Sequence, residues 1–307
     1  MSFLSVVNVS KKYDDHVALR NVSFDVPRKS IFGLLGPNGA GKTSLIRIIN
    51  NITAPDEGKV SLSRNNLQEN TSSYIGYLPE ERGLYKKMKV GEQALYLTML
   101  KGMDKHEAIV ELRKWFEKLN LSTWWNKRVE DLSKGMAQKL QFIVTVVHKP
   151  KLLILDEPFS GFDPINTKLI KEEILKLNRK GTTVIFSTHN MESVEELCDR
   201  IALINKAEKI LEGSVDEIKN NFQANKIRIS FKGNMIAFTN ALWTGCELLS
   251  SSSEGNINTV EIRLLGEVTK KVMLEAIMPH VELLSMTDVI PSMNDIFIDA
   301  VNQYKEG

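Results

Sequence analysis

The chain has 307 residues, of which 42% are hydrophobic and 25% are charged, and its formal net charge at pH 7 is +2. This composition is ordinary for a globular protein, and so small a charge gives no sign of a nucleic-acid partner. Two cysteines, Cys198 and Cys246, are too few for a disulfide framework and fit a reducing compartment. No apolar run approaches the ~20 residues that span a bilayer, and no signal peptide is recognisable, so we expect no membrane crossing.

Short apolar segments alternate with amphipathic ones in the first part of the chain, a pattern typical of an α/β sheet. The strands that we expect are Phe3–Val9, Val22–Val26, Ile31–Leu35, Ile75–Leu78, Leu152–Asp156, Thr183–Ser187 and Ile201–Ile204. Two of them, Ile31–Leu35 and Leu152–Leu155, are apolar without alternation, as expected of central strands that are covered on both faces. Between about residues 83 and 147 the apolar residues recur at helical spacing, which predicts a helical insert.

The polar segment Lys219–Asn225 marks a domain boundary, so we expect one domain over residues 1–220 and a second over residues 221–307. The second reads as strand, helix, strand, strand, helix and strand, the order of a ferredoxin-like α+β unit. A last helix is expected from about Met293 to Tyr304, and the serines Ser250–Ser253 are expected in a short loop.

The first chemical motif is a glycine-rich loop that follows an apolar strand and precedes a predicted helix, Thr43–Asn50. It fits G-x-x-x-x-G-K-[ST], with its fixed positions at Gly36, Gly41, Lys42 and Thr43. Glycines allow successive backbone N–H groups to point at phosphate oxygens, and the helix N-terminus adds a partial positive charge. The predicted ATP-binding residues here are Gly36, Pro37, Asn38, Gly39, Ala40, Gly41, Lys42, Thr43 and Ser44.

Two carboxylates follow the apolar strand Leu152–Leu155. Asp156 is expected to hold Mg²⁺ together with the Thr43 hydroxyl, because hard cations prefer oxygen ligands. Glu157 is expected to be the general base that activates the attacking water, because it lies at the C-terminal end of a strand, where ligands bind in open α/β sheets. The predicted cofactors are ATP and Mg²⁺.

A third motif lies between these two, at the expected start of the helix Met136–Val147. It consists of Leu132, Ser133, Lys134, Gly135 and Met136. With it, the chain over about residues 3–218 resembles the ABC ATPase family, whose signature reads LSGGQ at this place. The resemblance implies a P-loop ABC cassette, that is, an α/β fold with a mixed sheet and a helical insert.

Four further residues lie at positions that are landmarks of that family. By the resemblance, Tyr13 stacks on adenine, His189 is the switch histidine and catalytic, Asp163 belongs to the D-loop, and Glu80 stands where the family has a glutamine. Asp163 is also placed to cap a helix that begins at Pro164. The segment Asn205–Glu208 has a faint likeness to a guanine-reading motif, but a hairpin turn between two short strands explains it better.

The resemblance implies that the chain acts as the ATPase of a membrane transporter, of a bacterial exporter type. It implies a head-to-tail dimer with a second copy, or with a homologous cassette, in which the signature of one chain caps the ATP of the other. A separate membrane permease would dock on about Gly83–Leu121, and the chain would lie in the cytoplasm, peripheral on the inner face of the plasma membrane. The alternative is a cytosolic ABC ATPase that acts on ribosomes or DNA.

Three positions depart from the family pattern. Lys134 and Met136 replace glycine and glutamine of the signature, and the lysine is expected to bring charge to the phosphates. Glu80 adds a third carboxylate near the metal, so we expect the dependence on Mg²⁺ to differ from that of a chain with glutamine there.

Overall fold

The computed structural model describes residues 2–62, 71–81, 83–222, 226–242, 245–266, 268–289 and 291–306. It forms two compact units, one of Met1–Val215 with Ala300–Gly307 and one of Asp216–Asp299. The first unit therefore ends before the boundary expected at residue 220, which falls within helix α8 (Val215–Asn221). The end of the chain belongs to the first unit, where the Tyr304 hydroxyl donates a hydrogen bond to the Glu208 carboxylate.

A six-stranded sheet in the order β5-β6-β7-β3-β8-β9 forms the centre of the first unit. Its strands are β3 (Ile31–Leu35), β5 (Ile75–Leu78), β6 (Leu152–Asp156), β7 (Thr183–Thr188), β8 (Arg200–Asn205) and β9 (Glu208–Ser214). All neighbours are parallel except β8 and β9, which are antiparallel, so the predicted mixed sheet is confirmed. Every residue of β3, β6 and β7 is buried, as their continuous apolar sequences predict.

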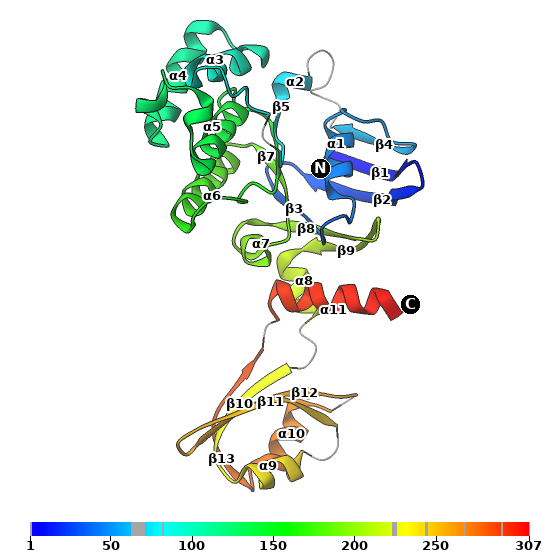
Figure 1. Ribbon diagram of the computed structural model, residues 1–307. Coiled ribbons are helices and arrows are strands. Elements are labelled where there is room, and N and C mark those ends of the chain that lie inside the picture. The colour runs from blue at the N-terminus through cyan, green and yellow to red at the C-terminus, as the bar shows by residue number, and fades with distance from the viewer. Residues whose placement is uncertain are drawn as a thin grey trace. The chain divides into compact units, whose positions relative to one another are not determined.

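The register of the parallel strands brings their C-terminal ends to one edge of the sheet. Leu35 pairs with Thr188, Asp156 with Ser187, and Leu78 with Leu155. Helix α1 (Lys42–Ile49) covers one side of this sheet, and helices α5 (Lys134–Val146) and α6 (Pro164–Arg179) cover the other (Figure 1). The loops that leave the four strands therefore meet at this edge, which is where ligands bind in open α/β sheets.

A smaller antiparallel sheet has the order β2-β1-β4. Its strands are β1 (Ser2–Tyr13), β2 (His16–Pro27) and β4 (Glu57–Leu62). The first two run further than the apolar segments predicted, because backbone pairing continues through exposed polar residues up to the pair Tyr13 and His16. Strand β4 was not predicted, since none of its residues is buried and its sequence carries no alternating apolar signal. Apolar side chains of this sheet, of α1 and of the large sheet share one core.

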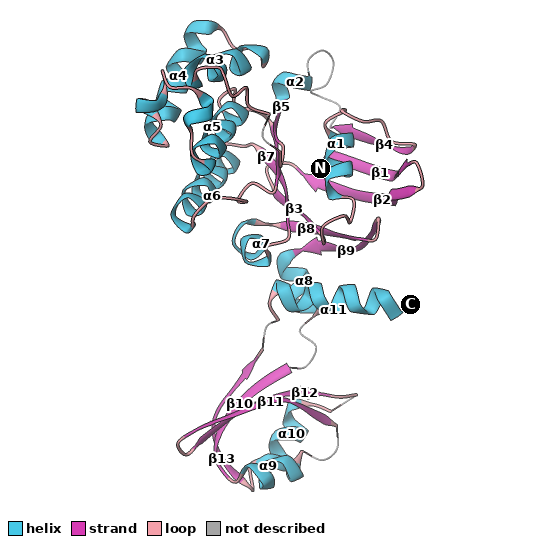
Figure 2. Cartoon of the chain, in the orientation of Figure 1, coloured by secondary structure: helices cyan, strands magenta, loops and turns pink. Residues whose placement is uncertain are grey.

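Helices α3 (Val90–Leu100), α4 (Lys105–Lys118) and α5 gather at one end of the first unit, which confirms the helical insert (Figure 2). Asp104 begins α4 as its N-cap, accepting a hydrogen bond from His106 N at 2.8 Å. The aromatic residues of this region pack edge to face, Trp115 on Phe142 and Phe116 on Trp125. These contacts agree with the core role that helical spacing predicts for them. Two short 3-10 helices, Ser122–Trp124 and Val129–Asp131, lie between α4 and α5, while the short helices α2 (Thr71–Tyr74) and α7 (Met191–Leu197) lie elsewhere in the first unit.

The second unit is a four-stranded antiparallel sheet in the order β11-β12-β10-β13 with two helices. Its elements are β10 (Lys226–Gly233), α9 (Met235–Ala241), β11 (Cys246–Glu254), β12 (Ile257–Leu264), α10 (Lys270–Ile277) and β13 (Val281–Asp288), followed by α11 (Met293–Glu306). The predicted α+β order is confirmed. The prediction of a loop at Ser250–Ser253 is wrong, because these exposed serines continue the edge strand β11, which pairs with β12. No helix within the described ranges has the length and apolar character that a bilayer crossing requires.

His148, just after α5, makes the stability of the first unit sensitive to acid. Burial, and to a smaller extent the positive charge of Lys101, lowers the pKa of His148 to about 4 from 6.5. Between these two pH values the unfolded chain binds a proton that the folded chain does not, so the free energy of unfolding decreases as pH falls. The loss attributable to this group is at most roughly 3 kcal/mol at pH 4.

We expect His148→Asn to flatten the pH dependence of stability between pH 6.5 and pH 4. Urea unfolding measured at several pH values in this window provides the comparison, because carboxylates titrate alike in the variant and the parent. His106→Asn, at an exposed position of α4, is the control and should leave the slope unchanged. Parallel stability curves for His148→Asn and the parent chain would contradict the assignment.

Candidate active site

The glycine-rich loop between β3 and α1 has a backbone that only glycine fits. Gly36, Gly39 and Gly41 have φ values of 147°, 79° and 112°. A Cβ atom at Gly36 would lie 2.1 Å from the carbonyl oxygen of Ile204, and one at Gly41 would lie 2.2 Å from that of Ala18. At Gly39 a Cβ would meet nothing within 4 Å, so conformation alone accounts for that glycine. The loop is thus held tightly against β8 and β2 and open at Gly39.

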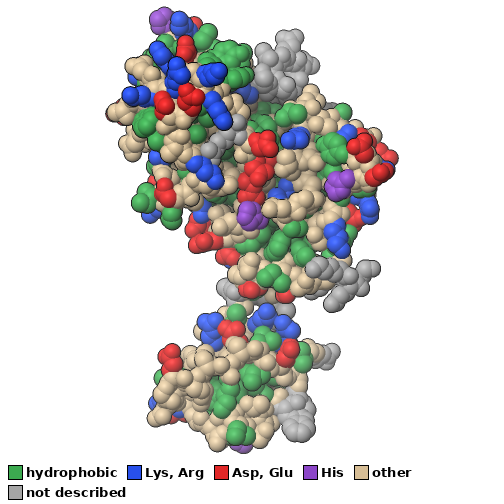
Figure 3. Space-filling view, in the orientation of Figure 1, with side chains coloured by type: hydrophobic (Ala, Val, Ile, Leu, Met, Phe, Trp, Pro, Cys, Tyr) green, Lys and Arg blue, Asp and Glu red, His purple; other side chains and the backbone are tan. Residues whose placement is uncertain are grey.

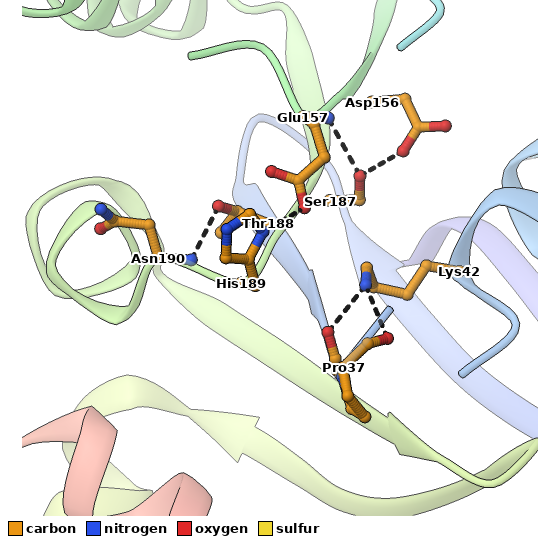
Figure 4. A network of polar contacts seen from close by, with 9 residues as sticks. Pro37, Lys42, Asp156, Glu157, Ser187, Thr188, His189 and Asn190 are labelled. Atoms are coloured by element: carbon orange, nitrogen blue, oxygen red, sulfur yellow. Dashed lines mark hydrogen bonds and ion pairs between the residues drawn. The ribbon is translucent and has the colours of Figure 1, made fainter. Parts of the chain in front are cut away.

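Lys42 lies inside the curve of this loop. Its side chain is buried, and Nζ donates hydrogen bonds to the carbonyl oxygens of Gly36 (2.7 Å) and Pro37 (3.1 Å), as Figure 4 shows. Burial lowers the pKa of Lys42, while the carboxylates of Glu157, Asp156 and Glu80 act in the opposite direction. A buried ammonium group with only neutral carbonyl acceptors is well placed to bind phosphate oxygens, since charged acceptors form the stronger hydrogen bonds.

Asp156 is the last residue of β6, and its two carboxylate oxygens differ in their hydrogen bonding. It is almost fully buried, and Oδ1 accepts a hydrogen bond from the Ser187 hydroxyl of β7. Oδ2 is buried and has no hydrogen-bond partner among the described residues. A buried carboxylate oxygen of this kind fits a hard cation such as Mg²⁺. The described part of the chain holds no group of three or more His, Cys, Asp or Glu side chains that could bind a metal unaided. Protein oxygens would therefore supply only part of a metal shell here, and phosphate oxygens or water would complete it.

Glu157 and His189 form a pair at the same edge. His189 Nδ1 lies 2.9 Å from Glu157 Oε1 (Figure 4). The backbone of Glu157 has a φ of 48°, a left-handed conformation that is uncommon outside glycine, and its N–H donates to Ser187. Asn190, which follows the histidine, is fixed by its own N–H bond to Thr188 Oγ1 and by capping α7. Hydrogen bonds to β7 thus fix the backbone at Glu157 and at Asn190, the residue next to His189.

A cavity of about 420 Å³ opens between these groups. Its lining residues are Tyr13, His16, Ala18, Asn38, Gly39, Gly41, Lys42, Thr43, Ser44, Glu80, Asp156 and Glu157. Most of the predicted ATP-binding and metal residues are therefore brought together. Gly36, Pro37 and Ala40 shape the loop from behind instead of lining the cavity. Sequence reasoning missed His16 and Ala18, although a hairpin after Tyr13 would have placed His16 opposite it.

A second cavity, of about 330 Å³, lies on the other side of the same carboxylates. It is lined by Leu78, Pro79, Glu80, Glu81, Lys134, Gln138, Gln141, Asp156, Glu157 and Ser160. Because three carboxylates line both cavities, the two spaces flank one acidic group of side chains. Acidic side chains also gather in the middle of the face of the first unit that Figure 3 draws.

The five signature residues lie at the start of α5, and none of them lines the first cavity. Ser133 is the N-cap of this helix, its hydroxyl accepting a hydrogen bond from Met136 N at 3.3 Å. Asp163 is likewise the N-cap of α6, accepting from Asn166 N at 2.9 Å. The capping interpretation of Asp163 therefore has a direct geometric basis, and its D-loop role stays a prediction.

Comparisons with known proteins agree with this geometry. Residues 19–160 match the family described as ABC transporter, and residues 213–301 match the C-terminal domain of DrrA1-3-like ATP-binding proteins. YhaQ of Bacillus subtilis (strain 168), named as an uncharacterized ABC transporter ATP-binding protein, is 47% identical over 226 residues, which are 74% of this chain and 76% of YhaQ. The chain belongs to the ABC transporter ATP-binding proteins.

Two further relatives extend the match. The linearmycin resistance ATP-binding protein LnrL of the same organism is 29% identical to this ABC protein over 306 residues, which are 96% of this chain and 97% of LnrL. A solved structure titled as the ATP binding subunit of an ABC transporter superposes with a TM-score of 0.67 and 28% identity, over 72% of this chain and 93% of that one. This ABC protein is accordingly an ATP-binding, ATP-hydrolysing transporter subunit.

We expect Gly36→Ala to weaken ATP binding far more than Gly39→Ala. Both substitutions place a side chain at positive φ, which costs about 1–2 kcal/mol, but only the first also collides with backbone. The loop must shift at position 36 and not at position 39. Titration with a fluorescent ATP analogue should give a dissociation constant at least about tenfold higher for Gly36→Ala than for Gly39→Ala. Equal constants would contradict the close contact with Ile204.

Proposed function

We propose that this ABC protein works as a pair of cassettes that close on two ATP molecules and open after hydrolysis. One observation carries the proposal: the loop around Lys42 and the carboxylates Asp156 and Glu157 line a cavity of about 420 Å³ at one sheet edge. His189 does not line this cavity and reaches the site through its contact with Glu157. The signature residues, including Ser133, are absent from the lining of this cavity. That arrangement supports a site completed by the signature of another copy, as the resemblance implies.

In this proposal the first cavity binds ATP by its triphosphate and its base. Lys42 exchanges its carbonyl partners for phosphate oxygens, and the N–H groups of the loop surround them. The ring of Tyr13 is partly exposed at the cavity wall, where it can stack on adenine. His16, its partner across the hairpin, lines the same wall and would contact the nucleotide beside it.

Glu157 is the proposed general base, because its carboxylate faces the nucleotide cavity and is oriented from behind by His189. The strained backbone at position 157 supports this role, since unusual dihedral angles persist where the surrounding structure fixes a functional side chain. His189 holds one carboxylate oxygen of Glu157, which leaves the other to accept the proton of water. The same histidine is the proposed contact to the terminal phosphate after ATP has bound.

Thr43, Asp156 and Glu80 are the proposed Mg²⁺ ligands, directly or through water. The free, buried Oδ2 atom of Asp156 supports the assignment, as does the place of all three residues in one cavity wall. The metal would neutralise charge on the phosphate oxygens. Glu80 adds negative charge beside Asp156, so it strengthens the attraction for a cation at the expense of the bound triphosphate.

A membrane permease is the proposed partner of this ABC protein, with the protein on the cytoplasmic side of the membrane. An apolar groove of about 360 Å³ supports this, because it lies between the segment after β5 and the helical insert. Its lining includes Leu84, Leu97, Leu100 and Val144, and Tyr96 and Met99 of α3 are exposed. The likeness to LnrL, named for resistance to linearmycin, favours export as the direction of transport. The second unit is proposed to be an accessory domain.

We expect Glu157→Gln to bind ATP, to lose hydrolysis by about a hundredfold or more, and to accumulate as a dimer with bound ATP. The amide keeps the shape of the side chain but cannot take a proton. Steady-state phosphate release and light scattering with and without ATP measure the two effects. Glu172→Gln, at an exposed position of α6, is the matched control. Normal turnover in Glu157→Gln would remove the proposed base.

We expect Glu80→Gln to need more Mg²⁺ for half-maximal ATPase activity, by about tenfold or less, because one carboxylate leaves the neighbourhood of the cation. Activity measured against free Mg²⁺ at saturating ATP gives the comparison. The neighbouring variant Glu81→Gln alters a carboxylate that lines only the second cavity, so it should shift the curve less. Superimposable curves for Glu80→Gln and the parent chain would refute the metal role of Glu80.

A further inference from the structure

Lys134 begins α5 at a place where the electrostatics of the helix oppose it. It is the first helical residue after the N-cap Ser133, and the first turn holds no acidic side chain. The N-terminus of a helix carries a partial positive charge, so a lysine there is electrostatically unfavourable. A contact of the Lys134 side chain outside its own helix would favour lysine at this position.

That contact is with Gly161, in the loop Phe159–Asp163 that follows Glu157. A Cβ atom built on Gly161 would lie 2.4 Å from Cε of Lys134, 3.2 Å from Cδ and 3.0 Å from Nζ. Gly161 has a φ of 87°, and the turn around it is closed by hydrogen bonds from Ser160 N to Glu157 O and from Phe162 N to Phe159 O. The end of the Lys134 side chain therefore lies directly against this turn, and a Cβ atom at position 161 would force it to move.

Lys134 also lines the second cavity. Glu80, Glu81, Asp156 and Glu157 line it too, and among the described residues that line it Lys134 is the basic one. Three of these carboxylates are the proposed base, Glu157, and the proposed metal ligands, Asp156 and Glu80, and they must stay close to a triphosphate that repels them. A cation in the same cavity offsets part of this repulsion.

We propose that Lys134 is a positioning residue for hydrolysis that acts within its own chain. Its methylenes fix the turn Phe159–Asp163 next to Glu157, and its charge offsets the acidic cavity behind the base. This inference rests on the proposed role of Glu157. It differs from the role in trans that the signature resemblance implies, because the contact with Gly161 exists in a single chain without nucleotide.

Three substitutions separate the packing of Lys134 from its charge. Lys134→Met keeps the unbranched chain over Gly161 and removes the charge, Lys134→Arg keeps both features, and Lys134→Gly removes both. Lys139→Met, on the same helix, removes a lysine whose Nζ donates to the Leu119 carbonyl away from the cavity, and it serves as the control.

The first measurement is hydrogen exchange of the amides in residues 159–163, in the full chain without nucleotide. We expect exchange about tenfold faster in Lys134→Gly, the effect of losing about 1.4 kcal/mol of local protection. Lys134→Met, Lys134→Arg and Lys139→Met should exchange like the parent chain. Unchanged exchange in Lys134→Gly overturns the proposal. If this variant also dimerises less well with ATP, Lys134 acts only on the other chain of the dimer.

The second measurement is the split of ATPase kinetics into kcat and KM. We expect Lys134→Met to lower kcat about tenfold with KM for ATP changed little, and Lys134→Arg to restore most of kcat. An unaltered kcat in Lys134→Met overturns the role of the charge and with it the proposal. If the parent chain does not hydrolyse ATP, the proposed function is wrong. The exchange measurement uses no nucleotide, so it still tests whether Lys134 fixes the turn.

A double-mutant cycle tests the contact should a single variant fold poorly. Gly161→Ala introduces the Cβ atom that meets Lys134 Cε, so its loss of thermal stability should be smaller in a Lys134→Ala background than in the parent. The remaining loss reflects the positive φ alone. Additive losses would show that the Lys134 side chain moves aside freely and does not fix the turn, which would overturn the proposal.

Discussion

The register of three parallel strands is the constraint on which this active site depends. Strand β7 pairs with β3 on one side and β6 on the other, so Thr188 lies beside Leu35 and Ser187 beside Asp156. A slip of one residue would turn every side chain of a strand to the opposite face of the sheet. The phosphate-binding loop, the carboxylates and His189 are distant in sequence, and only this pairing brings them together.

Charge balance is the second condition. The buried ammonium of Lys42 faces three carboxylates, and burial and attraction act on it in opposite directions. ATP adds negative charge to a site that is already acidic. In the proposed mechanism the site therefore requires cations, and Lys42, the proposed Mg²⁺ and Lys134 would supply them. This need explains why so many charged groups lie at one edge of an otherwise apolar sheet.

Much of this architecture could be predicted because the central strands and the phosphate loop carry strong local signals. The bounds of Ile31–Leu35, Ile75–Leu78 and Leu152–Asp156 are those that apolar runs predict. Exposed strands could not be predicted in the same way. Strand β4 and the serines of β11 are paired by backbone groups, which leave no pattern in the side chains.

The candidate site shows the same division between local and tertiary signals. Glycine-rich and acidic motifs identified the residues of the nucleotide cavity wall, because their chemistry is local. His16 and Ala18 line the same cavity through the register of a hairpin, which no motif marks. The contact of Lys134 with Gly161 joins segments that are separate in sequence, and neither residue alone predicts it. Tertiary packing decides such pairs.

Helix capping and function are not competing explanations in this ABC protein. Ser133, Asp163 and Asn190 each cap a helix, and each lies within or next to a family motif. A capping side chain is held by a backbone N–H of its own helix, which fixes its rotamer and the direction of the first turn. A motif residue at this position is therefore oriented before any ligand or partner arrives. Preorganisation of this kind reduces the entropy that binding must overcome, so a cap is a physical reason for a functional residue to stand there.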